Sequence, residues 1–199
     1  MDIQKTIDNL KREGFTVSYF ETAAQAADYI CAQFSGKTIG FGGSETVKEM
    51  KLYERLGENN AVYSHGVDPS PETFRNAATA DVYISSVNGL AESGEIINID
   101  GRGNRVSALL YGPKKVLYVV GVNKIAPDFA SAMDRARNIA GPLNARRLNK
   151  KTPCALGSEI KCYDCSSPER ICRGFSVQTR KMSGIEDMEV VLINEPLGY

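Results

Sequence analysis

The most apolar run in the chain is Lys115-Val116-Leu117-Tyr118-Val119-Val120-Gly121-Val122. After its first residue the run carries no charge, and it is rich in β-branched valine. Such a composition is typical of a central strand in a parallel sheet, which is buried on both faces. Pro127 follows closely and opens a predicted helix over residues 127–139, since proline fits the first turn of a helix.

The pattern repeats outward from this strand, because short β-branched and aromatic runs alternate with helical patterns through most of the chain. We predict strands at residues 15–20, 37–41, 61–64, 81–85 and 188–193, and helices at residues 1–13, 22–34, 45–56 and 71–80. This alternation predicts an α/β fold, with a mostly parallel sheet, right-handed crossovers and helices on both faces. The length of 199 residues suits one domain, residues 1–199, with an irregular cysteine-rich segment at 150–176.

Two stretches depart from the alternation. Residues 95–99 and 105–110 read as two strands joined by Asp100-Gly101-Arg102-Gly103-Asn104, because glycine and Asn tolerate the positive φ of a hairpin turn. Residues 86–94 read as a polar loop. Gly141-Pro142 is expected to end the helix that begins at Pro127, with a second short helical piece over residues 144–148.

Composition excludes several function classes. Lys plus Arg and Asp plus Glu each number 24, so the formal net charge is zero and no basic field favours nucleic acid. No signal-peptide pattern and no membrane-spanning run of roughly 18 apolar residues occurs. We therefore expect a cytoplasmic protein without membrane attachment, whose thiols are kept reduced.

A glycine loop follows the predicted strand at 37–41. Gly42 and Gly43 would let backbone N–H groups approach an anion, and Ser44 and Thr46 could add hydroxyl donors. The spacing is neither that of a Walker loop nor that of a dinucleotide fingerprint. The alternative is a tight turn with Ser44 as the helix N-cap. Glu45 is expected to point outward or to take part in acid–base work.

A second set of polar residues follows the predicted strand at 81–85. Glu92 is the best acid–base candidate, and Arg105 could clamp a carboxylate or phosphate. Asn88, Asp100 and Asn104 are candidate ligand contacts. The alternative for the turn residues is that they bond only within their own turn, and for Glu92 that it lies on the solvated surface. The single histidine, His65, could serve as a proton donor.

Four of the five cysteines lie close together in the sequence. Cys154, Cys162, Cys165 and Cys172 fall within 19 residues, and basic side chains flank them. Four thiolates can hold one zinc ion or one iron–sulfur cluster, and nearby cations stabilise thiolates. The spacing matches neither the usual zinc pairs nor the bacterial ferredoxin run. The alternative is a set of reduced thiols, or a single disulfide.

The chain resembles the LUD-domain (lactate utilisation) proteins. The resemblance is carried by the runs at residues 80–86, 90–96 and 100–105, by the stretch Arg137–Arg147, and most specifically by Cys162-Tyr163-Asp164-Cys165-Ser166-Ser167-Pro168-Glu169-Arg170-Ile171-Cys172. It implies a sheet similar to that of glucosamine-phosphate deaminase, ribose-5-phosphate isomerase and the CoA-transferases. In that group the first glycine loop binds phosphate or nucleotide, which places the ligand at Gly42, Gly43, Ser44 and Thr46. The isomerase pattern has several carboxylates in the loop that matches Asn88 to Glu92, and this chain departs from it.

The resemblance implies a role in oxidising lactate or a related organic acid, alongside iron–sulfur or flavin partner subunits. The first hypothesis is therefore a subunit or accessory factor that binds a small anionic ligand and carries an iron–sulfur cluster or zinc. The second is a stand-alone enzyme for a phosphorylated or CoA-linked small molecule, and the third is a binding or regulatory module stapled by zinc. We expect a homo-oligomer. The sequence does not decide whether the chain is itself an enzyme.

Overall fold

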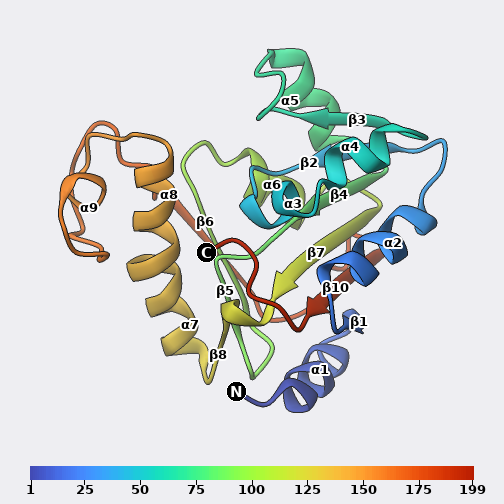
Figure 1. Ribbon diagram of the computed structural model, residues 1–199, viewed down its shortest axis with the longest axis horizontal. Coiled ribbons are helices and arrows are strands. Elements are labelled where there is room, and N and C mark those ends of the chain that lie inside the picture. The colour runs from blue at the N-terminus through green and yellow to red at the C-terminus, as the bar shows by residue number, and fades with distance from the viewer.

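The computed structural model describes residues 1–199 and contains two sheets (Figure 1). The first has six strands, all parallel, in the order β1-β10-β7-β4-β2-β3. Their bounds are Thr16–Phe20 (β1), Asp187–Ile193 (β10), Lys115–Gly121 (β7), Val82–Ser85 (β4), Thr38–Phe41 (β2) and Ala61–Ser64 (β3). The predicted α/β fold with a mainly parallel sheet is confirmed.

Side chains that alternate along β7 divide the core in two. Leu117 and Val119 face one cluster, which the helices α2 (Ala23–Gln33), α3 (Glu45–Glu49) and α4 (Leu52–Gly57) cover. Tyr118 and Val120 face the other cluster, which includes residues of α1 (Ile3–Arg12), α5 (Pro71–Ala78) and α6 (Asn104–Leu110). Because both faces are buried, the strand is apolar throughout rather than alternating.

The second sheet has four strands in the order β8-β5-β6-β9. Their bounds are Ile125–Ala126 (β8), Gly89–Ala91 (β5), Ile96–Asp100 (β6) and Gly174–Gln178 (β9). One face of this sheet packs on α7 (Phe129–Arg135), and Gly89 permits the contact because a Cβ there would lie 2.4 Å from the Ala132 carbonyl oxygen. The predicted loop at 86–94 therefore contains a short strand.

The predicted hairpin at 95–110 is wrong in its second half. Residues 104–110 form helix α6, and β6 pairs instead with β5 and β9, both antiparallel. The cause is Asp100, whose carboxylate accepts the backbone N–H groups of Arg102, Gly103, Arg105 and Val106 at 3.0–3.2 Å. These bonds satisfy the otherwise unpaired donors at the start of a helix, so the chain turns into α6.

Gly141-Pro142 does not end the helix as the sequence predicts. α7 continues through a π-helical turn, Ala136–Ala140 (η2), into α8, Gly141–Arg147. The Gly141 N–H donates to the Ala136 carbonyl, which widens the turn ahead of Pro142 and accommodates a residue that has no N–H to donate. Figure 1 shows α7 and α8 as one column that stands apart from the main sheet, with β5, β6 and β8 on the side toward that sheet.

The cysteine-rich segment forms no helix or strand between residues 157 and 173. It begins with the one-turn helix α9, Pro153–Leu156, and ends in β9, which joins the second sheet. The 3-10 turn Val122–Lys124 (η1) links β7 to β8. None of the helices has the length and the apolar character needed to cross a membrane.

Candidate functional site

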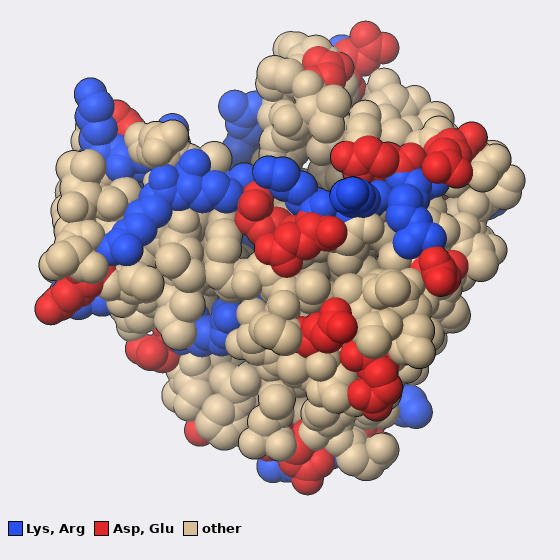
Figure 2. Space-filling model, in the orientation of Figure 1, with Lys and Arg blue, Asp and Glu red and all other residues tan.

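A cavity of about 620 Å³ opens where the parallel strands of the main sheet end. Gly43 and Ser44 follow β2, His65 follows β3, Ser86 follows β4 and Lys124 follows β7, and all five residues line the cavity. The opposite wall is formed by α8 and the cysteine-rich segment. Figure 2 shows the surface notched between the part that carries α5 and the part that carries α8 and α9. Ligands of open α/β sheets bind at this edge, so the cavity is the candidate site.

Positive charge dominates the cavity wall. Seven cationic residues line it, Arg102, Arg105, Lys124, Arg147, Lys150, Arg170 and Arg173, against the three acidic residues Glu45, Asp100 and Glu169. The excess of four cations contrasts with the zero net charge of the whole chain. In Figure 2 a band of Lys and Arg side chains runs from the α9 side toward the centre of this face. Such a concentration of cations favours an anionic ligand.

The glycine loop contributes part of the wall. Gly43 and Ser44 face the cavity, and Ser44 also accepts the Val47 N–H at 3.3 Å as the N-cap of α3. Gly42 lies behind them, where a Cβ would come within 2.7 Å of Arg105 Cδ. Thr46 is fully buried and donates its hydroxyl to the Leu197 carbonyl at 3.2 Å. The structure thus brings two of the four predicted loop residues to the cavity.

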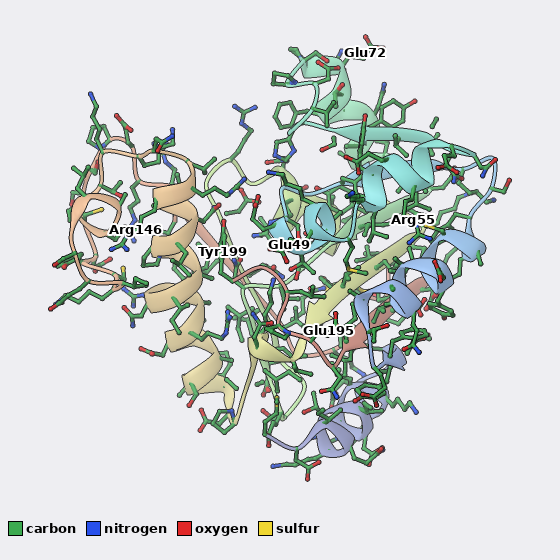
Figure 3. All side chains as sticks on the ribbon, viewed as in Figure 1. Glu49, Arg55, Glu72, Arg146, Glu195 and Tyr199 are labelled. Atoms are coloured by element: carbon green, nitrogen blue, oxygen red, sulfur yellow. The ribbon has the colours of Figure 1, made fainter.

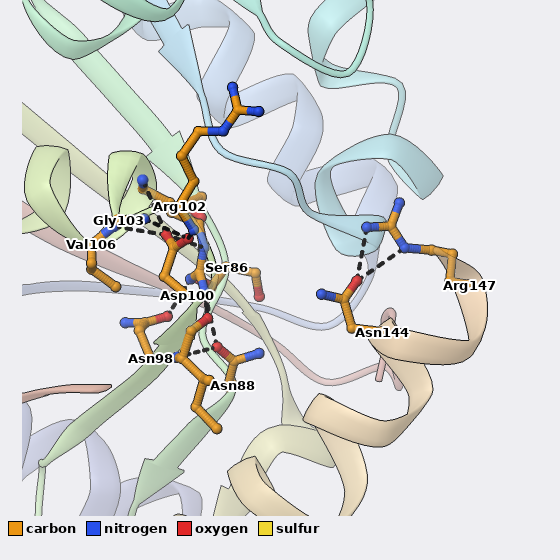
Figure 4. A network of polar contacts seen from close by, with 12 residues as sticks. Ser86, Asn88, Asn98, Asp100, Arg102, Gly103, Val106, Asn144 and Arg147 are labelled. Carbon is orange, nitrogen blue, oxygen red and sulfur yellow. Dashed lines mark hydrogen bonds and ion pairs between the residues drawn. The ribbon is translucent and has the colours of Figure 1, made fainter. Parts of the chain in front are cut away.

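Arg105 is held by hydrogen bonds within the protein, and its partners Ser86, Asn88 and Asn98 are labelled in Figure 4. Its Nη1 donates to Asn98 Oδ1 at 2.5 Å and to the Ser86 carbonyl at 3.4 Å, and its Nη2 donates to Asn88 Oδ1 at 3.0 Å and the Ile99 carbonyl at 2.6 Å. The side chain is 12% exposed and lines the cavity floor. Arg105 therefore fixes the loop after β4 against β6.

The predicted turn residues divide between structure and cavity. Asp100 caps α6, and although burial raises its pKa, the Gly103 N–H and the positive charge of Arg105 outweigh burial and lower that pKa. Asn88 accepts the Ile99 N–H at 2.8 Å through its side chain. Asn104 lines the cavity at the start of α6. Asn88, Asp100 and Asn104 all line the cavity.

The structure places Glu92 away from these residues. Its carboxylate accepts the Asp2 N–H at 2.8 Å and lies 3.5 Å from Lys5 Nζ, so it anchors α1 to the second sheet. The Asp2 N–H lowers the pKa of Glu92, and Lys5 adds to the effect. Glu92 is 6% exposed and does not line the cavity, so it lies neither on the solvated surface nor at the candidate site.

Lys124 is a cavity residue that the sequence reasoning missed. It is 3% exposed, and its Nζ lies 2.8 Å from Thr46 Oγ1 and 2.9 Å from Ser86 Oγ. No carboxylate lies within ion-pair distance of the amine. Burial lowers the pKa of Lys124 to about 7, and the charges of Arg135 and Arg105 act in the same direction. The sequence feature that could have identified Lys124 is its position just after the most apolar predicted strand of the parallel sheet.

His65 lies on the cavity wall opposite α8. Its ring stacks on Phe74 with centroids 5.0 Å apart, and the guanidinium of Arg102 sits over the same phenylalanine at 4.4 Å. Burial lowers the pKa of His65, as does the positive charge of Arg102. The imidazole is therefore neutral near pH 7, and its pKa reports the charge inside the cavity.

Arg147 and Tyr199 bring α8 and the C-terminal residues to the cavity (Figures 3 and 4). Arg147 Nη1 bonds to Glu45 Oε1 at 2.9 Å, which explains why Glu45 faces α8 and not a ligand. The Tyr199 hydroxyl accepts from Arg147 Nε at 2.9 Å and donates to Asn144 Oδ1 at 2.8 Å. Sequence reasoning missed these residues, because α8 and α3 are far apart along the chain.

The four clustered cysteines line one small pocket beside α8. Cys154, Cys162, Cys165 and Cys172 surround a space of about 20 Å³, together with Arg137 and Arg170. All four are free thiols, and no three Cys, His, Asp or Glu side chains in the structure lie close enough to hold a metal ion. The donors thus share a location and a chemistry suited to a thiolate-bound metal, although their sulfurs do not converge on one point.

Two arginines fix the course of the cysteine-rich segment. Arg146 on α8 donates to the carbonyls of Cys154, Gly157 and Glu159 (Figure 3). Arg170 donates to the carbonyls of Cys165 and Cys172 at 2.7 and 2.9 Å. Cys172 and Arg170 line both the small pocket and the large cavity, so the two sites share a wall. Burial raises the pKa of Cys172, against the opposing charge of Arg170.

Comparison with known proteins adds a family and a fold. A family model for the LUD domain matches residues 3–193. The crystal structure of a DUF162 family protein from Deinococcus radiodurans is similar, with a TM-score of 0.56, 13% sequence identity and coverage of 96% of this chain and 95% of that chain. At this identity the likeness supports the fold alone. No curated protein sequence matches the chain.

Proposed function

The chain belongs to the LUD-domain family, and from this premise we propose that it binds a small organic-acid anion in the cationic cavity as part of the oxidation of lactate or a related acid. The observation that supports this proposal is the excess of four cations at the carboxyl ends of the parallel strands. The carboxylate of the acid would bind to one of the cavity cations Arg102, Lys150 and Arg147. This contact would orient the acid, and the buried Ser86 and Lys124 would lie next to its reacting end.

Titration calorimetry of the full chain tests the binding. Lactate, pyruvate, inorganic phosphate, a sugar phosphate and coenzyme A serve as probes, each at constant ionic strength. We expect saturable heat with a carboxylate or phosphate probe, and weaker binding at higher salt because the cations are partly exposed. Absence of saturable heat with every probe would contradict the proposal.

A second function is favoured by the size of the cavity. A volume of about 620 Å³ lies in the range of pockets that enclose drug-sized ligands, and it far exceeds what a three-carbon acid occupies. A stand-alone enzyme for a phosphorylated or CoA-linked small molecule would fill more of this space, and the Phe74–His65 stack offers an apolar wall. Tighter binding of the sugar phosphate or coenzyme A than of lactate would favour this function.

For the cysteine-rich segment we propose a thiolate-bound metal. Zinc and iron–sulfur centres both take four sulfur ligands, which Cys154, Cys162, Cys165 and Cys172 would supply. Arg137 and Arg170 at the same pocket would stabilise the thiolates. A bound iron–sulfur centre would supply electron transfer to a flavin or iron–sulfur partner, whereas zinc would only staple the segment. The small volume of the pocket favours a single ion over a cubane cluster.

Metal analysis of protein prepared without oxygen tests the cysteine proposal. We expect about one zinc ion per chain, or iron and sulfide with broad absorption near ~400 nm. Cys165→Ser should lose most of this metal because it removes one of four ligands. Cys31→Ser should keep it, since Cys31 lies on α2 outside the segment. Equal metal content in wild type and Cys165→Ser would contradict the proposal.

A further inference from the structure

Lys124 is buried without a carboxylate partner, which distinguishes it from Lys115. Lys115, which is also partly buried, lies 2.9 Å from Glu189 and 3.0 Å from Asp187, so its charge is neutralised by carboxylates. Lys124 is almost completely buried, yet its neighbours are the hydroxyls of Thr46 and Ser86. A buried ammonium without a carboxylate is costly, so proteins seldom retain one without a chemical reason.

The position of Lys124 is that of a reacting group. Lys124 and Ser86 both line the cavity, at the carboxyl ends of β7 and β4 respectively, and the amine donates to the Ser86 hydroxyl. The amine is held by elements far apart in sequence, because Thr46 comes from α3 and Ser86 from the loop after β4. Two N–H groups of the Lys124 amine donate to these two hydroxyls. The third position on the nitrogen is therefore available to a ligand.

We propose that Lys124 is a nucleophile that forms a Schiff base with the carbonyl carbon of a small anionic ketone or aldehyde acid bound in the cavity. The inference rests on the proposed function, because it requires that the cationic wall holds the carboxylate. It goes beyond that function by naming the reacting atom and the ligand class, a 2-oxo or aldehyde acid.

The chemical step balances without any further reactant. Lys124 loses one proton to solvent through the Ser86 hydroxyl, and its nitrogen then adds to the carbonyl carbon while the carbonyl oxygen takes up a proton. The nitrogen of this adduct gives up a second proton, with which the hydroxyl leaves as water, and a protonated imine remains. The overall change converts an ammonium and a carbonyl into an iminium and water, so the net charge is unchanged. Ser86 lines the cavity next to the amine and is placed to pass these protons.

The charges around Lys124 favour the uncharged amine that attack requires. Arg105 and Arg135 oppose an ammonium there, and Glu49 is the one carboxylate that acts in the other direction. With a pKa near 7, a large share of Lys124 is neutral at physiological pH, whereas an exposed lysine is almost entirely charged. Lysines made nucleophilic by desolvation next to other cations are known to form Schiff bases with carbonyl substrates.

Reductive trapping of the imine with cyanoborohydride tests the proposal. The full chain is mixed with pyruvate or with glyoxylate, reduced with cyanoborohydride, and mapped by peptide mass spectrometry. We expect one dominant adduct, on the peptide that contains Lys124, formed at least about tenfold faster than at any exposed lysine because more of its amine is uncharged. Lys124→Met should abolish this adduct, and Lys11→Met, which removes an exposed lysine outside the cavity, should keep it at Lys124.

A third variant, Ser86→Ala, keeps the test informative if Lys124→Met fails to fold. Ser86→Ala retains the lysine and should slow adduct formation, since it removes one proton relay. Adducts spread equally over exposed lysines, or no adduct with either acid, would overturn the proposal. Calorimetric binding of pyruvate without an adduct would refute the Schiff base and leave the proposed function standing. Neither heat nor adduct with any probe would refute both.

Discussion

Replacing Arg105 with Met is expected to lower the free energy of unfolding by about 3–5 kcal/mol, because it leaves several buried acceptors without their donor. The guanidinium satisfies Asn88, Asn98 and two backbone carbonyls at once. For a chain of this length the change corresponds to a fall of roughly 10 °C in the unfolding midpoint. Arg105→Lys should lose most of the same stability, since an ammonium lacks the planar fork that reaches two acceptors on each side.

Chemical denaturation of Arg105→Met and Arg102→Met gives the comparison. Arg102 lies in the turn before α6, is exposed and rests on Phe74, so its loss should change the free energy of unfolding by no more than about 0.5 kcal/mol. If Arg105→Met were as stable as Arg102→Met, Arg105 would not be the anchor of the loop after β4. The interpretation that the sequence suggests, in which Arg105 clamps the ligand, would then be favoured.

Removing Arg102 and Lys150, two of the cavity cations that form no ion pair, is expected to weaken anion binding about 30-fold. The side chains of Arg102 and Lys150 line the cavity without forming an ion pair within the chain, so a ligand is their natural partner. The double variant Arg102→Ala, Lys150→Ala should lose about 2 kcal/mol of binding free energy, between the values for exposed ion pairs and charge-assisted hydrogen bonds. Calorimetry with the tightest-binding probe measures the loss.

A matched control keeps the same change in net charge. Lys11 on α1 and Lys37 before β2 are exposed and lie outside the cavity, so Lys11→Ala, Lys37→Ala should leave the affinity unchanged within about twofold. Equal losses in the two double variants would show that the anion responds only to overall charge. The cavity would then hold no specific site.

Local sequence was sufficient to predict the main sheet. The run that became β7 carries no charge after Lys115, and the run that became β10 is apolar except at Asp187 and the buried Glu189, a composition typical of strands covered on both faces. Residues 104–110 show where local information ends. The stretch Arg105–Leu110 suits a strand or a helix equally, and the four N–H groups that Asp100 accepts decide for the helix.

The candidate site was only partly predictable, because its residues meet through contacts between distant segments. Glu92 looked like a free acid in a glycine-flanked loop, and only the fold reveals that α1, about ninety residues away, covers it. No recognisable sequence motif contains Lys124, and its chemical environment depends on the distant residues Thr46 and Ser86. The cysteines were recognisable as a group, but their shared pocket depends on Arg146 and Arg170.

An organic anion bound among the cations of the cavity would be detected most directly through the pKa of His65. His65 is the only histidine in the chain, so its imidazole signal is unambiguous in an NMR titration. Burial and the charge of Arg102 hold its pKa below the usual range in the free protein. A bound carboxylate or phosphate would favour the imidazolium, so we predict that the pKa of His65 rises when a saturating probe is added at constant ionic strength. An unchanged pKa of His65 would contradict the account.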